Sequence, residues 1–253
     1  MSASRVGDWW RPFKLVGDAT VIHVDLTPNA AREAEALGWL DESEQSRWRR
    51  FQFAGPRRRF GLCRAALRAI LCRRLECENG QLAFEESRHG KPFATVEGMP
   101  VPESFNVSHS GGHGLIAFAP AGRLGVDIEE RVAHRNLDLL VETVLGEQEQ
   151  ALLARTRGDA RTHLFFKLWT MKEALIKAHG KGMALDPSRV QIPSAMLGGT
   201  TRSTLKSPEI PGVRWRLDDL SNDQFAAAVA HELCAAPGPS RGNGSALETP
   251  ANS

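Results

Sequence analysis

The sequence predicts an α+β fold made of two similar halves, and the order of its periodic segments carries this prediction. Residues 20–26, "TVIHVDL", place apolar side chains at every second position, which is typical of a half-buried strand. Residues 123–129 form a second opening strand. After each opening strand the pattern becomes helical and then returns to short strands. Residue identity between the halves is slight, so the repeated order of elements alone indicates a duplicated α+β unit.

In the first half, residues 29–53 have a mostly helical pattern. Asp41 is the expected N-cap of a helix, and Glu44, three residues later, completes a capping box. Pro56 suits the first turn of the next helix. The apolar stripe of that helix recurs at helical spacing and consists of Phe60, Cys63, Leu67, Ile70 and Leu71. Short strands are expected near residues 82–86, 104–108 and 114–119, with a turn at 88–92.

The second half has a similar order of elements. Helices are expected near residues 136–145, 147–156 and 160–179, followed by strands near 189–192, 213–218 and 224–230. Residues 235–253 are rich in Pro, Gly, Ser and Asn without a periodic apolar face, so we expect a disordered tail. The expected division is an N-terminal half at 1–119, a C-terminal half with a metal site at 120–234, and the tail.

Composition excludes some classes of protein. Apolar residues make up 42% and charged residues 25% of the chain, which is typical of a globular protein in water. No apolar run approaches the ~18 residues that span a bilayer, and the N-terminus has no signal-peptide core. We therefore expect a cytoplasmic protein without a membrane partner. The cysteines lack zinc-site spacing, and reduced thiols are expected at Cys63, Cys72, Cys77 and Cys234.

One segment is strongly basic. Ten arginines and no acidic residue lie between Arg47 and Arg74. Such a run is either a solvated helix face or a site for phosphates or an acidic partner, and the sequence leaves both interpretations open. Base-stacking aromatic residues are not interleaved with the arginines in the way that nucleic-acid binding favours, so no nucleic-acid partner is expected.

The strand "LGVDIEE" at 124–130 places two carboxylates on one face. Successive side chains of a strand point to opposite faces, so Asp127 and Glu129 share one side. Two neighbouring carboxylates repel each other unless a cation or a proton lies between them. Oxygen ligands of this kind suit Mg²⁺, which takes one or two carboxylates together with water and substrate phosphate. The alternative is a strand face that is merely solvated.

The helix within "FFKLWTMKEALIKAHGKG" at 165–182 adds a third carboxylate. Trp169, Glu173 and Lys177 are four residues apart and lie along one helical face. One interpretation is a simple salt bridge between Glu173 and Lys177. The functional interpretation is a third metal ligand, with a cation one turn further on for a phosphate. Gly180 is the expected C-cap.

Two further stretches carry donors for phosphate oxygens. In "FNVSHSGGHG" at 105–114, Ser108 and His109 end a strand. A Ser–His hydrolase pair is disfavoured because adjacent strand residues point apart and the G-x-S-x-G motif is absent. "HGKPF" at 89–93 is a β-turn that presents Lys91.

Together and in this order, four motifs resemble the signature set of the Sfp-like 4′-phosphopantetheinyl transferases. They are "GKP" at 90–92, "FNVSHS" at 105–110, "GVDIE" at 125–129 and "WTMKEALIKAHGKG" at 169–182. The Trp-x-x-Lys-Glu-Ala form is similar to the broad-substrate branch of that family. The resemblance covers about residues 20–230, and it is less sharp over 46–68. It implies a pseudo-dimer of two α+β halves with the active site in the cleft between them.

The resemblance also implies an activity. Members transfer 4′-phosphopantetheine from coenzyme A to a serine of an apo acyl carrier protein or peptidyl carrier domain, with Mg²⁺, and release adenosine 3′,5′-bisphosphate. Such carriers serve fatty acid, polyketide and nonribosomal peptide biosynthesis, and a monomer is expected.

The resemblance carries roles to individual residues by motif position. Asp127, Glu129 and Glu173 match the Mg²⁺ ligands, Glu173 the general base, and Lys177 the cation that stabilises charge on the pyrophosphate. Contacts to coenzyme A are implied for Arg47, Arg59, Lys91, Ser108, His109 and Lys177.

Two other classes of function stay open on the sequence. A non-catalytic binding module would use the basic face at 47–74 to dock an acidic protein or nucleic acid. A Mg²⁺-dependent phosphoesterase would share the metal site but would need no acceptor protein.

Overall fold

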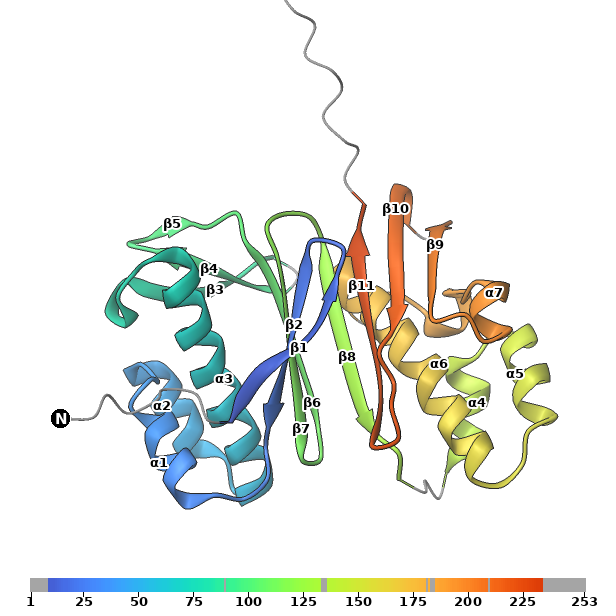
Figure 1. Cartoon of the computed structure of the whole chain (residues 1–253), viewed down its shortest axis with the longest axis horizontal. Coiled ribbons are helices and arrows are strands. Elements are labelled where there is room, and N and C mark those ends of the chain that lie inside the picture. Colours follow the sequence, from blue (N-terminus) through green and yellow to red (C-terminus); the bar gives the residue numbers. More distant parts are fainter. Residues whose placement is uncertain are drawn as a thin grey trace, which may run out of the picture.

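The protein was analysed as a computed structural model, which describes residues 9–88, 90–132, 136–180, 182, 185–208 and 210–233. Two four-stranded antiparallel sheets lie against each other in the middle of the molecule, and helices cover the outer side of each sheet (Figure 1). One sheet and its helices come from the first half of the chain, and the other sheet and its helices come from the second half. The predicted α+β fold of two similar halves is therefore confirmed.

The N-terminal half forms one sheet of order β1-β2-β7-β6 and a smaller sheet of order β3-β4-β5. Its long helix α3 packs on the four-stranded sheet through an apolar core that includes Leu67, Ile116 and Phe118. The elements are β1 (Trp10–Val16), β2 (Ala19–Asp25), α1 (Ala30–Leu37), α2 (Glu42–Arg50), α3 (Ala54–Leu75), β3 (Leu82–Glu86), β4 (Pro92–Val96), β5 (Met99–Pro100), β6 (Ser104–Ser110) and β7 (His113–Ala119).

The C-terminal half forms a sheet of order β8-β11-β10-β9. Its long helix α6 packs on this sheet through a core that includes Leu175, Trp215 and Ala228. The elements are β8 (Leu124–Glu130), α4 (Leu137–Val144), α5 (Glu147–Ala154), α6 (Gly158–His179), α7 (Ser194–Leu197), β9 (Arg202–Ser207), β10 (Ile210–Asp219) and β11 (Phe225–Glu232), and a short 3₁₀ helix spans Pro187–Arg189.

A third apolar cluster joins the two sheets. Val21 and Leu115 contribute from the N-terminal sheet, and Val126, Ile128 and Val229 contribute from the C-terminal sheet. The side chains of Val126 and Ile128 therefore face the other half of the molecule across β8 and are fully buried. Because hydrophobic burial dominates association, this layer holds the two halves as one body.

Local signals of the sequence agree with the structure where they depend on neighbours along the chain. Asp41 caps α2, and the reciprocal capping box with Glu44 is present. Gly180 ends α6 with a φ of 82°, a left-handed conformation that favours glycine. Cys63, Cys72 and Cys77 are free thiols, as expected. Cys234 and the predicted tail lie outside the described residues.

The strand predicted near 189–192 is wrong. The 3₁₀ helix at Pro187–Arg189 begins this segment, and the amide of Val190 donates to the carbonyl of Pro187. The amide of Ile192 donates to the side chain of Glu149 instead of to a neighbouring strand, and Pro193 has no amide hydrogen to donate. Four strands were missed, since their residues are mostly exposed or half-buried and their periodicity is weak: β1, β4, β5 and β9.

The predicted boundary between residues 119 and 120 stays a prediction, and in the structure β7 ends at Ala119 and β8 begins at Leu124. Across the part of the chain that the structure describes, we find no helix with the length and apolar character required to span a membrane.

Candidate active site

The site is built where β8 meets β6 and α6. Gly125 allows this meeting, because a Cβ atom at that position would lie 2.1 Å from the carbonyl oxygen of Ala174 and 2.4 Å from the amide nitrogen of Ala178. A glycine inside a strand often marks a place where another group approaches the backbone closely, and here the approaching group is the backbone of α6. The glycine therefore sets the helix that carries Glu173 directly against the strand that carries Asp127.

The inner edges of the two sheets are joined by a polar seam, which we define as the contacts between β6 and β8. Asn106, Ser108 and Ser110 alternate along β6 and share one face. The Asn106 side chain accepts from the amide of Val126 at 2.9 Å, and Ser108 Oγ donates to Asp127 Oδ1 at 2.8 Å. Ser110 Oγ donates to Glu129 Oε2 at 2.7 Å. Both strand carboxylates of the motif are thus held by serines of the other half.

Asp127 is the most buried carboxylate at this seam, with 3% of its surface exposed. The Lys177 ammonium lies 2.6 Å from Asp127 Oδ1 and also donates to Ser108 Oγ at 2.9 Å. Asp127 Oδ2 is buried and has no hydrogen-bond partner among the described residues. A buried carboxylate oxygen without a donor is costly, so this oxygen retains unused capacity to bind a cation or a hydrogen-bond donor.

Glu129 and Glu173 belong to the same electrostatic group. Burial raises the pKa of Glu129, and the charges of Asp127 and Glu173 raise it further against the hydrogen bond from Ser110 and the charge of Lys177. Burial and then Asp127 raise the pKa of Glu173, again opposed by Lys177. Three mutually repelling carboxylates therefore face one ammonium group. A donor set of hard oxygens with a deficit of positive charge fits a divalent cation such as Mg²⁺.

The carboxylates are not preorganised as a metal cage. Among the described residues, no group of three or more His, Cys, Asp or Glu side chains is positioned to hold a metal ion. Lys177 pairs with Asp127. Among the described residues it forms no ion pair with Glu173, so the simple salt-bridge interpretation is wrong. Ligation by Asp127, Glu129 and Glu173 together therefore requires side-chain reorientation, and it stays a prediction.

A cavity of about 630 Å³ opens beside the carboxylates. Trp169, Glu173 and Lys177 all line it, so the predicted shared face of α6 is the face that borders the cavity. Much of the remaining lining of the cavity is apolar and includes Leu140, Val144, Leu185 and Pro187. We call this space the carboxylate cavity.

Lys91 lies at the edge of the carboxylate cavity and bridges the two halves. Its ammonium donates to the carbonyl oxygens of Leu124 at 2.9 Å and of Ala178 at 3.4 Å. Burial lowers the pKa of Lys91 to about 8, and the charge of Arg123 contributes in the same direction. In this conformation Lys91 fastens β8 and α6 to the N-terminal half, and these contacts use two of the three N–H donors of its ammonium.

A second, basic cavity of about 230 Å³ adjoins the first, and Pro92 and Asn106 line both. Arg47, Arg64 and His109 are the basic residues that line this cavity. Its apolar lining includes Phe60, Cys63 and Phe105.

Arg59 belongs to the surroundings of the basic cavity. Its positive charge opposes the rise in the pKa of Cys63, which burial brings to about 12. The sequence disfavoured a catalytic pair of Ser108 and His109, and the structure agrees, because Ser108 is buried toward Asp127 whereas His109 is exposed on the other face of β6. Of the predicted coenzyme residues, Lys91 and Lys177 line the carboxylate cavity, and Arg47 and His109 line the basic cavity. Arg59 and Ser108 line neither cavity.

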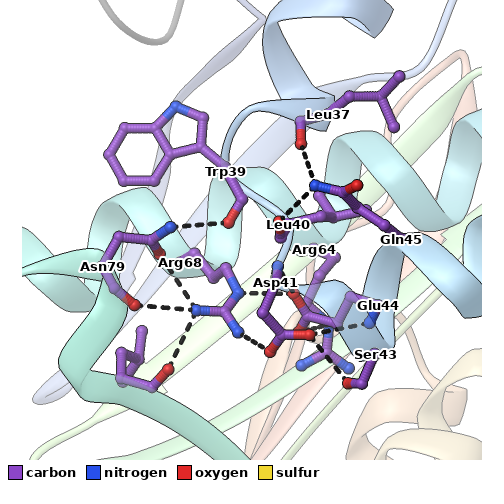
Figure 2. A network of polar contacts seen from close by, with 11 residues as sticks. Leu37, Trp39, Leu40, Asp41, Ser43, Glu44, Gln45, Arg64, Arg68 and Asn79 are labelled. Carbon is purple, nitrogen blue, oxygen red and sulfur yellow. Dashed lines mark hydrogen bonds and ion pairs between the residues drawn. The ribbon is translucent and has the colours of Figure 1, made fainter.

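The basic segment at 47–74 is partly consumed by internal contacts. The Arg68 guanidinium is 1% exposed and donates to Glu44 Oε2 at 2.6 Å and to the carbonyl of Leu82 at 3.1 Å. It also pairs with Asp41 and with the side chain of Asn79 (Figure 2). Arg68 is therefore neither solvated nor available for phosphate, so both predicted interpretations are wrong for this arginine.

Sequence reasoning missed the residues of the seam that are not charged. Asn106 and Ser110 hold β8, and the amide of Gly112 donates to Glu130 Oε1 at 2.7 Å. Polar residues at every second position of "NVSHS" were a detectable signal, since they mark one face of a strand as polar. The partner of that face was not detectable, because it lies on another strand.

Comparison with known proteins identifies the family. A family model described as "4′-phosphopantetheinyl transferase superfamily" matches residues 123–230, and one described as "4′-phosphopantetheinyl transferase, N-terminal" matches residues 26–121. These matches follow the two halves of the fold.

Three relatives agree with these matches. A putative 4′-phosphopantetheinyl transferase of Synechocystis sp. is 34% identical over 200 residues, which cover 76% of this chain and 78% of the relative. The 4′-phosphopantetheinyl transferase HetI of Nostoc sp. is 36% identical over 145 residues, covering 57% and 61%. The 4′-phosphopantetheinyl transferase Sfp of Bacillus subtilis is 27% identical over 164 residues, covering 65% and 70%.

The family matches and the named relatives indicate a transferase rather than a non-catalytic binding module. The chain belongs to the 4′-phosphopantetheinyl transferase family.

Proposed function

We propose that this protein is an Sfp-like enzyme that transfers 4′-phosphopantetheine from coenzyme A to a serine of an apo acyl or peptidyl carrier protein. The reaction requires Mg²⁺ and releases adenosine 3′,5′-bisphosphate, and the enzyme acts as a cytoplasmic monomer. The observation that carries the proposal is the convergence of Asp127, Glu129 and Glu173 with the Lys177 ammonium beside a cavity. This is the donor set that a Mg²⁺-dependent transfer of a phosphate ester needs.

The two adjoining cavities match the two chemical parts of coenzyme A. The nucleotide carries several phosphates, and the basic cavity offers Arg47, Arg64 and His109. The pantetheine arm is long and mostly uncharged, and the carboxylate cavity offers an apolar wall that includes Leu140 and Leu185. With the two parts so placed, the pyrophosphate between them passes near Lys177 and the carboxylates.

Protein groups supply the proton transfer and most of the positioning. The serine hydroxyl of the carrier attacks the β-phosphorus, and the new O–P bond forms as the bond from that phosphorus to the bridging oxygen breaks. Glu173 accepts the hydroxyl proton, and its raised pKa suits a carboxylate that works as a general base. The electron pair leaves on adenosine 3′,5′-bisphosphate, whose growing negative charge the Lys177 ammonium stabilises.

Asp127, Glu129 and Glu173 would hold the Mg²⁺ ion. When bound, the ion supplies a Lewis acid for the phosphate oxygens. The unpartnered Asp127 Oδ2 is the protein oxygen that most needs such a partner.

Exposed arginines of α2 favour an acidic carrier as the acceptor. Arg68 is buried and adds no charge to the surface. Arg47, Arg49 and Arg50 are exposed, so their charges are available to a partner. Opposite charges on two partners accelerate their encounter, and salt screens this effect. The KM for the carrier should therefore rise with ionic strength, and a KM that is independent of salt would argue against this steering.

The direct test incubates the protein with Mg²⁺, coenzyme A and a panel of apo carrier proteins. Intact-protein mass spectrometry should show one phosphopantetheine adduct on the carrier, and a carrier in which the acceptor serine is replaced by alanine should show none. Chelation of Mg²⁺ should stop the reaction. Release of product without any carrier would instead indicate a phosphoesterase, and no adduct on any carrier would contradict the proposal.

A further inference from the structure

A buried ion pair lies on the side of α6 that faces away from the carboxylates. Lys172 is fully buried, and its ammonium lies 2.7 Å from Glu149 Oε2. The same ammonium donates to the carbonyl oxygens of Pro187 at 2.9 Å and Val190 at 2.7 Å. Lys172 directly precedes Glu173, yet it does not line the carboxylate cavity.

Glu149 completes the pair by accepting two backbone amides. Gly146 donates to its Oε2 at 2.8 Å, and Ile192 donates to its Oε1 at 3.2 Å. The pair therefore connects α6, the start of α5 and both ends of the stretch from Pro187 to Ile192. Each polar atom of the pair has a partner, which offsets the high cost of burying two charges.

The stretch that the pair holds is a wall between two cavities. Leu185 and Pro187 line the carboxylate cavity. On the other side, Ser188, Gln191 and Ile192 line a separate cavity of about 650 Å³. Because a cavity lies behind this stretch, one of its sides has fewer packing contacts than an ordinary core segment has. Hydrogen bonds must therefore contribute more to holding the stretch in place.

We propose that Lys172 and Glu149 are positioning residues that hold residues 185–192 as the wall against which the pantetheine arm of coenzyme A binds. The inference rests on the proposed function, because that function places the arm in the carboxylate cavity. Neither residue touches the substrate. Their effect passes through the carbonyl oxygens of Pro187 and Val190 and the amide of Ile192 to the apolar side chains of the wall.

The test compares two ligands that differ in the pantetheine arm. Coenzyme A carries the arm, whereas adenosine 3′,5′-bisphosphate lacks it. The double variant Lys172→Met/Glu149→Gln removes both charges together, so that neither charge remains buried alone. We expect the Kd of coenzyme A, measured by calorimetry, to rise about tenfold while the Kd of the bisphosphate changes less than about twofold. In turnover, KM for coenzyme A should rise while kcat at saturation stays within about threefold of the wild type.

A matched control comes from the same helix. Lys167 of α6 pairs with Asp219 at 2.8 Å, and Asp219 is largely buried, but neither residue lines the carboxylate cavity. Lys167→Met/Asp219→Asn should leave the affinity for both ligands unchanged. Equal losses for both ligands in the Lys172→Met/Glu149→Gln protein, or no loss for coenzyme A, would overturn the positioning role.

A milder variant decides the matter if the double variant does not fold. Glu149→Gln keeps an acceptor for one amide but removes the negative charge. Relative to wild type, we expect faster hydrogen exchange in peptides covering residues 185–192. We also expect the variant to lose more affinity for coenzyme A than for the bisphosphate. Unchanged exchange and affinity would overturn the proposal. Failure of the wild-type protein to bind coenzyme A at all would instead contradict the proposed function.

Discussion

The ionic cluster around Arg68 and the one around Asp127 are made of the same kinds of side chain, but they differ in how completely their polar atoms are paired. In the N-terminal half, all three nitrogens of the Arg68 guanidinium have acceptors, including Glu44 and Asp41 (Figure 2). At the seam, Asp127 Oδ2 has no partner within the described residues. We call the first cluster complete because its central group, the Arg68 guanidinium, is fully paired within the chain, although Nη1 of the neighbouring Arg64 is buried without a partner. The second cluster is incomplete at its central group, Asp127.

This difference separates structural from functional charge. A buried charge that is fully hydrogen-bonded contributes to a specific fold and has no capacity left for a ligand. A buried carboxylate with an unused oxygen and two like-charged neighbours instead lowers stability, and a bound cation relieves that cost. The long helices α3 and α6 both have 22 residues and both carry buried charges, so length and burial alone do not distinguish the two cases.

The largest expected effect is a loss of catalytic rate when a carboxylate of the incomplete cluster is replaced. Glu173→Gln should lower kcat for carrier modification by about 10²–10⁴-fold, which is the usual contribution of a general base. The melting temperature should stay the same or rise, since a repelling charge is removed. Initial rates followed by mass spectrometry, together with thermal melts, check both expectations. Near-normal turnover would remove Glu173 from the chemistry.

The complete cluster should respond in the opposite way. Arg68→Met leaves Glu44 buried without its main partner, and breaking such a pair costs about 3–5 kcal/mol of unfolding free energy. Urea denaturation measures this loss. The kcat of the folded fraction should be unchanged. Arg50→Met, at an exposed position of α2, is the matched control and should change stability by less than about 0.5 kcal/mol. A small effect at Arg68 would break the distinction between the two clusters.

The two clusters should also have opposite pH dependences. Burial and neighbouring carboxylates raise the pKa of Glu129 and Glu173 above 4.5 in the folded protein. Their contribution to stability is therefore fully present below pH 4.5 and is lost as pH rises through the folded pKa values. Without divalent cations, Glu129→Gln/Glu173→Gln should melt higher than wild type at pH 7 and equally at pH 4. An equal difference at both pH values would contradict this assignment.

In the complete cluster, the stability that Asp41 contributes depends on pH in the opposite direction. Burial favours a higher pKa, but hydrogen bonds from Glu44 and Ser43 and the charge of Arg68 outweigh it and lower the pKa below 3.8. The stability from Asp41 is present above pH 3.8 and is lost as pH falls through its folded pKa. Asp41→Asn should therefore lower the melting temperature at pH 7 and have less effect on it under strongly acidic conditions. If the melting temperature of Asp41→Asn stayed equally far below that of the wild type under strongly acidic conditions, the lowered pKa of Asp41 would be contradicted.

The smallest expected effect compares two serines that each donate to a carboxylate. Ser108 donates to Asp127 at 2.8 Å, and Ser43 donates to Asp41 at 2.9 Å. Ser108→Ala should lower kcat by up to about tenfold, because loss of one hydrogen bond to a charged group corresponds to about 1.5 kcal/mol. Ser43→Ala, at an exposed position, should leave kcat unchanged. Equal kinetics for the two variants would show that Ser108 does not orient the site.

Local signals made much of the fold predictable. The capping box at Asp41, the left-handed cap at Gly180 and the alternating pattern of the opening strands depend on neighbours in the chain. The prediction of a strand near 189–192 was wrong because Lys172 and Glu149, which hold that segment, are distant from it in sequence. A short apolar run carries no local information about whether its amides will pair with a strand or with a side chain.

The candidate site was predictable in its residue types more than in its contacts. The order of the motifs along the chain is enough to group Asp127, Glu129, Glu173 and Lys177 as one set. The pairing of Lys177 with Asp127 rather than with its helical neighbour Glu173 was not predictable. It depends on how closely α6 approaches β8, and Gly125 determines that distance.

The sequence by itself determined most of the elements, the two-half order and the carboxylates that share a face, because periodicity and capping act over a few residues. Only the tertiary structure decided which charges are structural. Arg68 and Arg47 lie in the same basic run, yet the first is buried among acceptors and the second borders a cavity. The physical reason is that the role of a charged side chain depends on its partners and its burial, and both are set by segments that are far apart in sequence and meet only in the fold.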